Sequence, residues 1–362
     1  LGFHGVFQAG ENQEVKLRIT ASTLYRVFLN GEFVGYGPAR AAHGYFRVDE
    51  YDLGSRVKPG GNVVAVEVAG YNVNSYYTID VPSFLQAEVE AGGKIALATG
   101  TDNGFSAFQL KERLQKVERY SFQRPFTEYY RMTENSNQWR STVEAPAEPL
   151  KLAAQPNVDL LPRNLLLPEF EVVRPVEIYS QGIIGFQKPE KYRKDRSLTN
   201  ISEKLKGYPE TELEVLPSQM MQEIISEKID TLRQPFGGNP VGLKENEFAT
   251  FAFSANLSGF IGAKVSCTKP SKLVFYFDEM LTGGDVVTKQ RMGDVNNQVV
   301  YELAPGTYNL ETFESYTFKF LKVIVLEGEC RMDDIYLREY AYPRNEMASF
   351  SYSNEKLNAI YE

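Results

Sequence analysis

The stretch YRVFLNGEFV, residues 25–34, is the part of this sequence that decides its fold class. Two apolar-rich runs flank the pair Asn30-Gly31, and both residues of such a pair tolerate a positive φ. Asn-Gly between two strand-like runs therefore predicts a tight β-hairpin. Just before it, residues 15–20 alternate apolar and polar side chains, which is the period of a half-buried strand. The chain thus begins with antiparallel β-structure rather than with helix.

Strand-like runs separated by turn residues continue through most of the chain. Many short strands with regular turns are typical of antiparallel sandwiches. The run LVFYF at 273–277 is continuously apolar, which predicts a strand buried on both faces. Further strand-like runs are 63–68, 84–90, 95–99, 248–253, 261–267, 298–303, 316–326 and 335–340.

These patterns predict an all-β protein with two antiparallel, jelly-roll-like β-sandwiches. The length of 362 residues is enough for two cores. We assign the first sandwich to residues 1–145 and the second to residues 178–345. Residues 146–177 carry six prolines, which disfavour helices and sheet interiors, so we expect an extended linker there.

One short helical insertion is predicted near residues 219–233. Apolar side chains recur there at helical spacing at Met221, Ile225, Ile229 and Leu232. Ser218 precedes them and can cap a helix. We interpret the stripe as a face packed on a neighbouring sheet rather than as a ligand site.

Residues 346–362 are predicted to start a linker helix. Leu357, Ile360 and Tyr361 fall on one apolar stripe. A helix of about eight residues is marginal alone, so the stripe needs a partner. We expect it to lead into a further, helical domain, and a short terminal helix docked on the second sandwich is the alternative.

Composition excludes several function classes. A net charge of −8 argues against a nucleic-acid partner, because phosphate binding needs a basic surface. No apolar run is long enough to cross a membrane. Two cysteines, Cys267 and Cys330, are too few for a disulfide framework, and we favour free thiols over a single bridge. The sequence does not decide whether a signal peptide was removed or was never present. We favour a periplasmic or secreted location over a cytoplasmic one.

Several motifs, in order along the chain, resemble the α-L-rhamnosidase family of glycoside hydrolases. LNGEFVGYGPAR at 29–40 and HGYFR at 43–47 resemble the N-terminal domain of the bacterial members. KPGGNVVAV at 58–66 resembles an element of sugar-binding-like sandwiches in several glycoside hydrolases. Other pieces resemble that family's second sandwich and its junction with the catalytic helical barrel: 256–260, 275–279, 313–323 and 353–362. The polar stretch 178–245 matches least and looks like an insertion.

The resemblance implies a parent enzyme that hydrolyses terminal α-L-rhamnosyl bonds by inversion, with two carboxylates in the barrel. No barrel motif occurs before Glu362, so no catalytic residue is assigned to this chain. We therefore predict an accessory, non-catalytic region whose partners are a rhamnose-containing carbohydrate and its own C-terminal catalytic domain. The alternatives are a stand-alone carbohydrate-binding protein and, third, a complete enzyme with carboxylates assembled across the two sandwiches.

Candidate sugar-binding or domain-contact residues lie in two loop-like segments and at one strand end. Aromatic rings beside fork-shaped donors suit a polyol, but the same side chains could anchor the first sandwich against the catalytic barrel that the resemblance implies. We favour the anchoring interpretation. The candidates are Tyr36, Arg40, His43, Tyr45, Arg47, Asn72, Asn74, Tyr76, Tyr77, Asp278 and Glu279.

No metal or cofactor is predicted. Asp49, Glu50 and Asp52 are the group most suited to calcium, which prefers several oxygen ligands. No dense Asp-x-Asp pattern accompanies them, so we favour roles in turns and caps.

Overall fold

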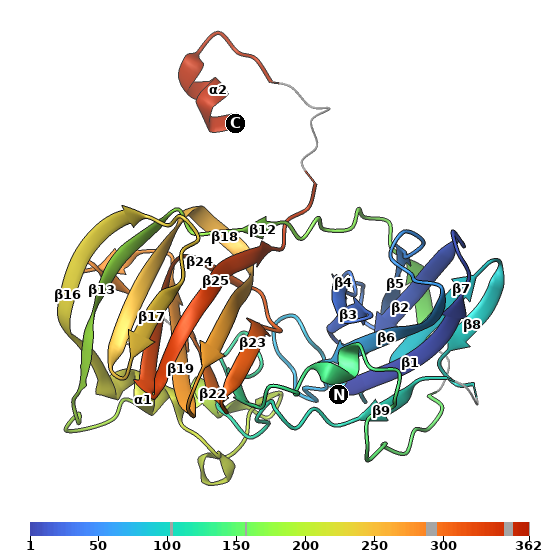
Figure 1. Cartoon of the computed structure of the whole chain (residues 1–362), viewed down its shortest axis with the longest axis horizontal. Coiled ribbons are helices and arrows are strands. Elements are labelled where there is room, and N and C mark those ends of the chain that lie inside the picture. Colours follow the sequence, from blue (N-terminus) through green and yellow to red (C-terminus); the bar gives the residue numbers. More distant parts are fainter. Residues whose placement is uncertain (102–103, 156–157, 287–294, 344–349, 362) are drawn as a thin grey trace.

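The computed structural model describes residues 1–101, 104–155, 158–286, 295–343 and 350–361. Two β-sandwiches stand side by side, joined by extended segments (Figure 1). The predicted all-β class with two sandwiches is confirmed. Within those ranges, no helix combines the length and the apolar content that a membrane span requires.

The first sandwich consists of two five-stranded sheets. Its strands are β1 (Gly2–Ala9), β2 (Val15–Ala21), β3 (Tyr25–Leu29), β4 (Glu32–Gly37), β5 (Tyr45–Asp52), β6 (Gly60–Val68), β7 (Leu85–Ala91), β8 (Lys94–Ala98), β9 (Ser106–Phe108) and β11 (Asp159–Pro162). One sheet has the order β4-β3-β6-β1-β9 and the other the order β11-β5-β2-β7-β8. Asn30 and Gly31, between β3 and β4, have φ values of 52° and 90°, as the predicted hairpin requires.

The alternation seen in the sequence sets the two faces of β2. Val15, Leu17 and Ile19 are completely buried in the core of the first sandwich. Lys16 and Arg18 project from the other face, where each forms ion pairs with glutamates. A side-chain period of two places all apolar residues of the strand on one side of the sheet.

The second sandwich is one large sheet folded over itself. Its strands are β10 (Glu128–Met132), β12 (Val172–Val173), β13 (Glu177–Phe186), β16 (Ile224–Pro235), β17 (Val241–Lys244), β18 (Glu247–Cys267), β19 (Ser271–Asp278), β22 (Gln298–Leu303), β23 (Gly306–Glu311), β24 (Tyr316–Glu327) and β25 (Glu329–Glu339). The main order is β10-β22-β19-β24-β18-β13-β16, and β12, β17, β23 and β25 attach to other edges.

Strand β18 connects the two layers of this sandwich. Its first half pairs with β13 and β24, and its second half pairs with β23 and β25. Its register against β24 shifts between Ala252 and Leu257, and from Gly259 on it pairs with β25. The sequence had suggested two separate runs at 248–253 and 261–267, and the structure joins them into one bent strand.

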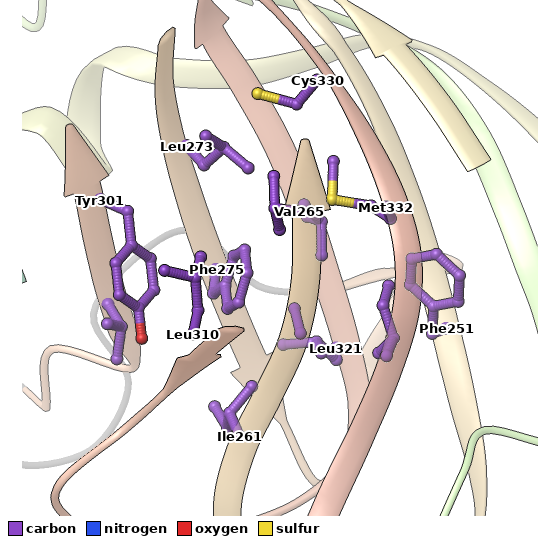
Figure 2. Packing of buried hydrophobic residues seen from close by; sticks show 14 of the residues in the cluster. Phe251, Ile261, Val265, Leu273, Phe275, Tyr301, Leu310, Leu321, Cys330 and Met332 are labelled. Carbon is purple, nitrogen blue, oxygen red and sulfur yellow. The ribbon is translucent and has the colours of Figure 1, made fainter. Parts of the chain in front are cut away.

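Strand β19 is buried on both faces, as predicted. Leu273 and Phe275 point into the core between the layers, where Figure 2 shows Phe275 beside Leu310. Val274 and Tyr276, on the opposite face, belong to a second apolar cluster. In that cluster they are covered by side chains of the segment 114–126 and of the short helix α1 (Pro217–Glu223).

The predicted helix over residues 219–233 is wrong beyond its first turn. Helix α1 ends at Glu223, and the next residues form β16, which pairs antiparallel with β13. Met221 and Ile224 are buried against the sheet, so the apolar stripe does pack on it. A neighbouring strand with free hydrogen-bonding groups outweighs the helical spacing, which periodicity alone cannot reveal.

Two segments cross between the sandwiches. Strand β10 lies inside the predicted first unit, 1–145, but pairs in parallel with β22 of the second sandwich. Strand β11 lies inside the predicted linker, 146–177, but pairs in parallel with β5 of the first. The order of strands along the sequence does not tell which sheet each one joins.

Short elements occupy the connections, and a helix stands at the carboxyl end. They are β14 (Asn200–Ser202), β15 (Leu205–Lys206), β20 (Leu281–Thr282), β21 (Asp285–Val286), the 3-10 helices η1 (Gln138–Arg140), η2 (Arg196–Leu198) and η3 (Glu210–Glu212), and helix α2 (Glu355–Tyr361). Figure 1 shows α2 apart from both sandwiches, and Leu357 and Ile360 are 43% and 80% exposed. The linker helix and the alternative of a docked helix both stay predictions, and residues 346–349 and 362 of the predicted linker lie outside the described residues.

Candidate functional site

The two sandwiches meet in a region that we call the junction, formed by β3, β4, β6 and loop 69–78 of the first sandwich and by β18 and loop 311–316 of the second. Tyr36, on β4, is buried there. Its ring centroid lies 4.8 Å from that of Phe260 and 5.5 Å from that of Tyr340. Aromatic pairs at these separations attract beyond their burial. Tyr36 thus contacts the second sandwich, whereas the anchoring interpretation placed it against a further catalytic domain, and that interpretation stays a prediction.

A buried charge network lies beside this aromatic cluster. Arg26, on β3, donates two hydrogen bonds to Oε2 of Glu67 on β6, at 2.9 and 2.7 Å. It also donates to the backbone carbonyls of Glu311 and Thr312, at 3.2 and 3.1 Å, and so links the first sandwich to the second. Arg140 donates to the other oxygen of Glu67.

The electrostatics of Glu67 follow from this arrangement. Burial alone would raise the pKa of Glu67, but the charges of Arg140 and Arg26 hold that pKa at about 2. A buried carboxylate with two guanidinium partners keeps its charge at every physiological pH. Glu67 is therefore a structural anion and not a proton donor.

Glu314 forms a second link. Tyr77, from the loop after β6, donates to its Oε2 at 3.0 Å, and Tyr71 donates to its Oε1. Arg124 donates to Oε2 at 3.1 Å. Burial and the charge of Glu314 raise the pKa of the Tyr77 hydroxyl well above its usual value, so it remains a donor.

Glu128, on β10, fixes the loop that carries Glu314. Its completely buried carboxylate accepts hydrogen bonds from the backbone N–H of Phe313 and Glu314, at 2.8 and 2.9 Å. The hydroxyls of Tyr316 and Tyr130 donate to the same carboxylate. The crossing strand β10 therefore positions the loop of the second sandwich that faces the first.

The sequence candidates of the 36–47 segment fall into two groups. Arg40 stacks over the ring of Tyr77, with 5.1 Å between the guanidinium carbon and the ring centroid. Arg47 donates to the carbonyls of Arg40 and Pro162, at 2.9 Å each, so it braces its own sandwich. His43 and Tyr45 are exposed.

The remaining candidates do not converge with these. The Asn72 side chain accepts a hydrogen bond from Ser83, and that of Asn74 accepts one from the backbone of Asp80, so both order their own loop. Tyr76 is 64% exposed, and its ring lies 5.4 Å from that of Phe122.

Asp278 and Glu279 lie at the end of β19 in the second sandwich. The side chain of Asp278 accepts a hydrogen bond from the backbone N–H of Glu279 at 2.8 Å, and Glu279 itself is exposed. Adjacent residues at a strand end point in different directions, so this pair does not form a two-carboxylate site by itself.

The carboxylates considered for calcium already have protein partners. Asp49 is buried and pairs with Arg163 at 2.7 Å, while Glu50 pairs with Arg18 at 2.9 Å. Asp52 accepts a hydrogen bond from a backbone N–H two residues further on. No group of three metal-ligating side chains occurs in the ranges that the structure describes.

A cavity of about 350 Å³ opens within the junction. Both sandwiches line it, with charged, amide and aromatic side chains. Its lining includes Tyr71, Glu112, Arg113, Tyr301, Asn309 and Phe313, none of which was a sequence candidate. Asn72, which was a candidate, also lines it.

The sequence did contain one signal for the junction. Arg26 and Glu67 each interrupt an otherwise apolar strand, in YRVFL and VAVEVA. A charge inside a strand that is buried on both faces requires a buried partner. The partners themselves come from distant segments, so no local motif names them.

Comparison with known proteins agrees with this architecture. No protein-family model matches the sequence, and no curated protein sequence matches it. Solved structures do match. A GH78-family rhamnosidase from Bacillus sp. GL1 aligns with a TM-score of 0.76 at 17% identity, over 100% of this chain and 55% of that chain. This chain has the fold of part of a rhamnosidase.

Two other solved structures agree. An α-L-rhamnosidase from Dictyoglumus thermophilum has a TM-score of 0.58 at 15% identity, over 99% of this chain and 34% of that one. An α-L-rhamnosidase from Aspergillus terreus has a TM-score of 0.55 at 16% identity, over 99% of this chain and 36% of that chain. The rhamnosidase resemblance is thereby confirmed at the level of the fold. The chain spans about half the length of the Bacillus rhamnosidase.

Proposed function

We propose that this chain is the accessory, non-catalytic region of an α-L-rhamnosidase. The observation that carries the proposal is the fold match along the whole chain to only 55% of the Bacillus rhamnosidase. The proposed partner is a catalytic domain of the same protein, which would hydrolyse terminal α-L-rhamnosyl bonds by inversion.

The proposed task is to hold a rigid platform for that domain. Arg26, which Glu67 holds in place, donates to the backbone carbonyls of Glu311 and Thr312 and so ties the first sandwich to the second. The hydroxyls of Tyr71 and Tyr77 add further bonds to Glu314. The exposed apolar residues Leu357 and Ile360 of α2 supply a surface that a further domain would cover.

The arrangement of carboxylates supports a non-catalytic role. Inversion needs an acid and a base about 6.5–9.5 Å apart, with room for a water molecule. In the cavity, the low pKa of Glu67 rules it out as the acid, and Glu311 is bound by Tyr336 and Arg338. Glu112 has a pKa raised by burial and is the one cavity carboxylate suited to donate a proton.

An assay with an aryl α-L-rhamnoside tests the proposal. The 362-residue chain is expected to show no turnover, and the same region expressed with the coding sequence that follows residue 362 is expected to show it. Turnover by the 362-residue chain that disappears in Glu112→Gln would overturn the proposal in favour of an enzyme assembled across the sandwiches. Glu50→Gln, on the solvent face of β5, is the matched control.

A stand-alone carbohydrate-binding protein is the second candidate. The exposed ring of Tyr76, set edge-on against Phe122, favours it because exposed aromatic faces cover the apolar side of sugars. If this candidate holds, titration calorimetry detects rhamnose binding that Tyr76→Ala weakens. Absence of binding to the intact chain removes it.

A further inference from the structure

The junction cavity contains an arginine in an unusual position. Arg113 lines it, and three rings surround its guanidinium: those of Tyr71, Phe313 and Tyr130, with centroids 5.5, 5.4 and 6.0 Å from the guanidinium carbon. The hydroxyl of Tyr71 accepts one hydrogen bond from it at 3.2 Å. A guanidinium has five N–H donors, so this bond uses one of the five, and Arg113 lines the cavity.

The other junction arginines differ from Arg113. Arg26 and Arg140 both pair with Glu67, and Arg124 pairs with Glu314. Among the residues that the structure describes, no carboxylate lies within 4.0 Å of the Arg113 guanidinium. A cation away from bulk water is usually paired with an anion, so this position lacks its counter-ion.

The negative charge of Glu128 does not fill that role directly. It helps to raise the pKa of Arg113, against the effect of burial, and so keeps the guanidinium charged. However, its two oxygens already accept the hydrogen bonds of the 313–316 loop and of Tyr130. Arg113 is thus a charged donor without a direct ionic partner in the described part of the chain.

A second observation in the same cavity points to a ligand. The hydroxyl of Tyr301, which lines the cavity, is buried and has no hydrogen-bond partner among the described residues. A buried hydroxyl without a partner is unfavourable, because it has lost its hydrogen bonds to water. The exposed amide of Asn309, on β23, lies on the wall of the same cavity. A ligand that fits this cavity would therefore carry a negatively charged group for Arg113. It would also carry hydroxyls that can bond to Tyr301 and Asn309.

The volume of the cavity limits the size of what it can hold. About 350 Å³ is near the lower end of small-molecule sites, which span about 300–1,000 Å³. Tyr71 and Phe313 add aromatic surface around the Arg113 guanidinium in the cavity wall. These dimensions fit one sugar unit and not an oligosaccharide.

We propose that the junction cavity binds a single acidic sugar, a polyhydroxylated ring with one carboxylate, which pairs with Arg113 while ring hydroxyls bond to Tyr301 and Asn309. A planar guanidinium matches a carboxylate in a two-pronged geometry. Because the ligand contacts both sandwiches, its binding also strengthens the junction. The site stands apart from the bracing role, and neither proposal depends on the other.

Titration calorimetry of the intact chain with D-galacturonate and D-galactose tests the proposal. The two sugars share the ring and differ in the group at C6, a carboxylate or a hydroxymethyl. Galacturonate is expected to bind at least about tenfold more tightly, because one charge-assisted bidentate contact contributes about that much. Equal affinity for the two sugars, preferential binding of galactose or rhamnose, or no binding of any of them would each overturn the proposal.

Variants separate the carboxylate contact from general damage to the junction. Arg113→Gln is expected to remove the preference for galacturonate, and Arg113→Lys to retain part of it. Asn309→Asp places a negative charge on an exposed wall position, and we expect it to weaken galacturonate binding more than galactose binding. Arg174→Gln, at an exposed ion pair on the second sandwich, is the control that leaves both unchanged.

The single tryptophan of the chain reports whether the junction stays intact. Trp139 packs on the first sandwich, against Phe108, and precedes Arg140, which pairs with Glu67 of the junction. We therefore expect its fluorescence to change when that ion pair breaks. If Asn309→Asp keeps the wild-type spectrum and still binds galacturonate with unchanged affinity, the carboxylate assignment is wrong. If only Tyr76→Ala reduces binding, the sugar site lies on the exposed loop and not in the cavity.

Discussion

The cores of the two sandwiches and the junction between them are built from different chemistry. The core around Phe275 is apolar, and neighbouring strands supply its side chains. The junction is held by buried ions, such as Arg26 with Glu67, and by tyrosine hydroxyls on Glu314. Apolar packing tolerates many partners, whereas a buried ion pair needs one particular partner in one geometry. The cores therefore provide stability, and the junction determines how the two sandwiches are oriented.

The largest expected effect comes from the core. Phe275→Ala removes a completely buried ring between the layers of the second sandwich and is expected to lower the free energy of unfolding by about 3–5 kcal/mol. Chemical denaturation followed by circular dichroism measures it. The exposed Phe186→Ala serves as control, and equal effects of the two changes would contradict the description of this core.

The junction is tested by Glu67→Gln. This change leaves the buried guanidinium groups of Arg26 and Arg140 without their carboxylate, and removal of one partner of a buried pair costs about 3 kcal/mol or more. We expect Trp139 fluorescence to change before the circular dichroism signal during denaturation. A single transition with unchanged midpoint would show that the junction ions do not hold the sandwiches together.

Acid is expected to act on the same pair to a smaller extent. The pKa of Glu67 is about 2 in the folded chain and near 4.5 when unfolded, so its contribution is complete above pH 4.5 and decreases as pH falls toward 2. By pH 3 the loss is about 2 kcal/mol. Stability curves between pH 6 and pH 3 measure it, and Glu67→Gln should reduce the slope.

The smallest effect is expected at the surface. Arg174 pairs with Asp334 at 2.8 Å, but more than half of its side chain is exposed. Arg174→Ala should change the free energy of unfolding by less than about 1 kcal/mol, because solvent screens such pairs. A larger loss would mean that ion pairs stabilise this protein irrespective of burial, and the contrast with Glu67 would disappear.

The same contrast explains which parts of the structure were predictable. The alternation at Val15, Leu17 and Ile19 and the apolar run 273–277 fix strands and their buried faces, because each strand carries that information in its own side chains. The helix over 219–233 failed because hydrogen bonds to β13, a separate strand, decide its conformation.

The candidate site was less predictable. Tyr36 and Tyr77 were predicted as contact residues because aromatic rings in loop-like segments are suited to binding. Both contact the second sandwich. Arg113 was not identified, since one arginine in a polar stretch carries no pattern. Its significance arises from the absence of a carboxylate beside it in the described part of the fold, which only coordinates reveal.

The parallel pairing of β10 with β22 has a consequence for synthesis on the ribosome. The residues that pair are separated by about 170 positions, as in Arg131 and Glu302. At roughly 5–20 residues per second, β10 emerges roughly 10–30 seconds before its partner strand exists. During that interval the nascent chain presents an unpaired strand edge with tyrosines at 129 and 130, a target for chaperones and for misassociation with neighbouring polysomes.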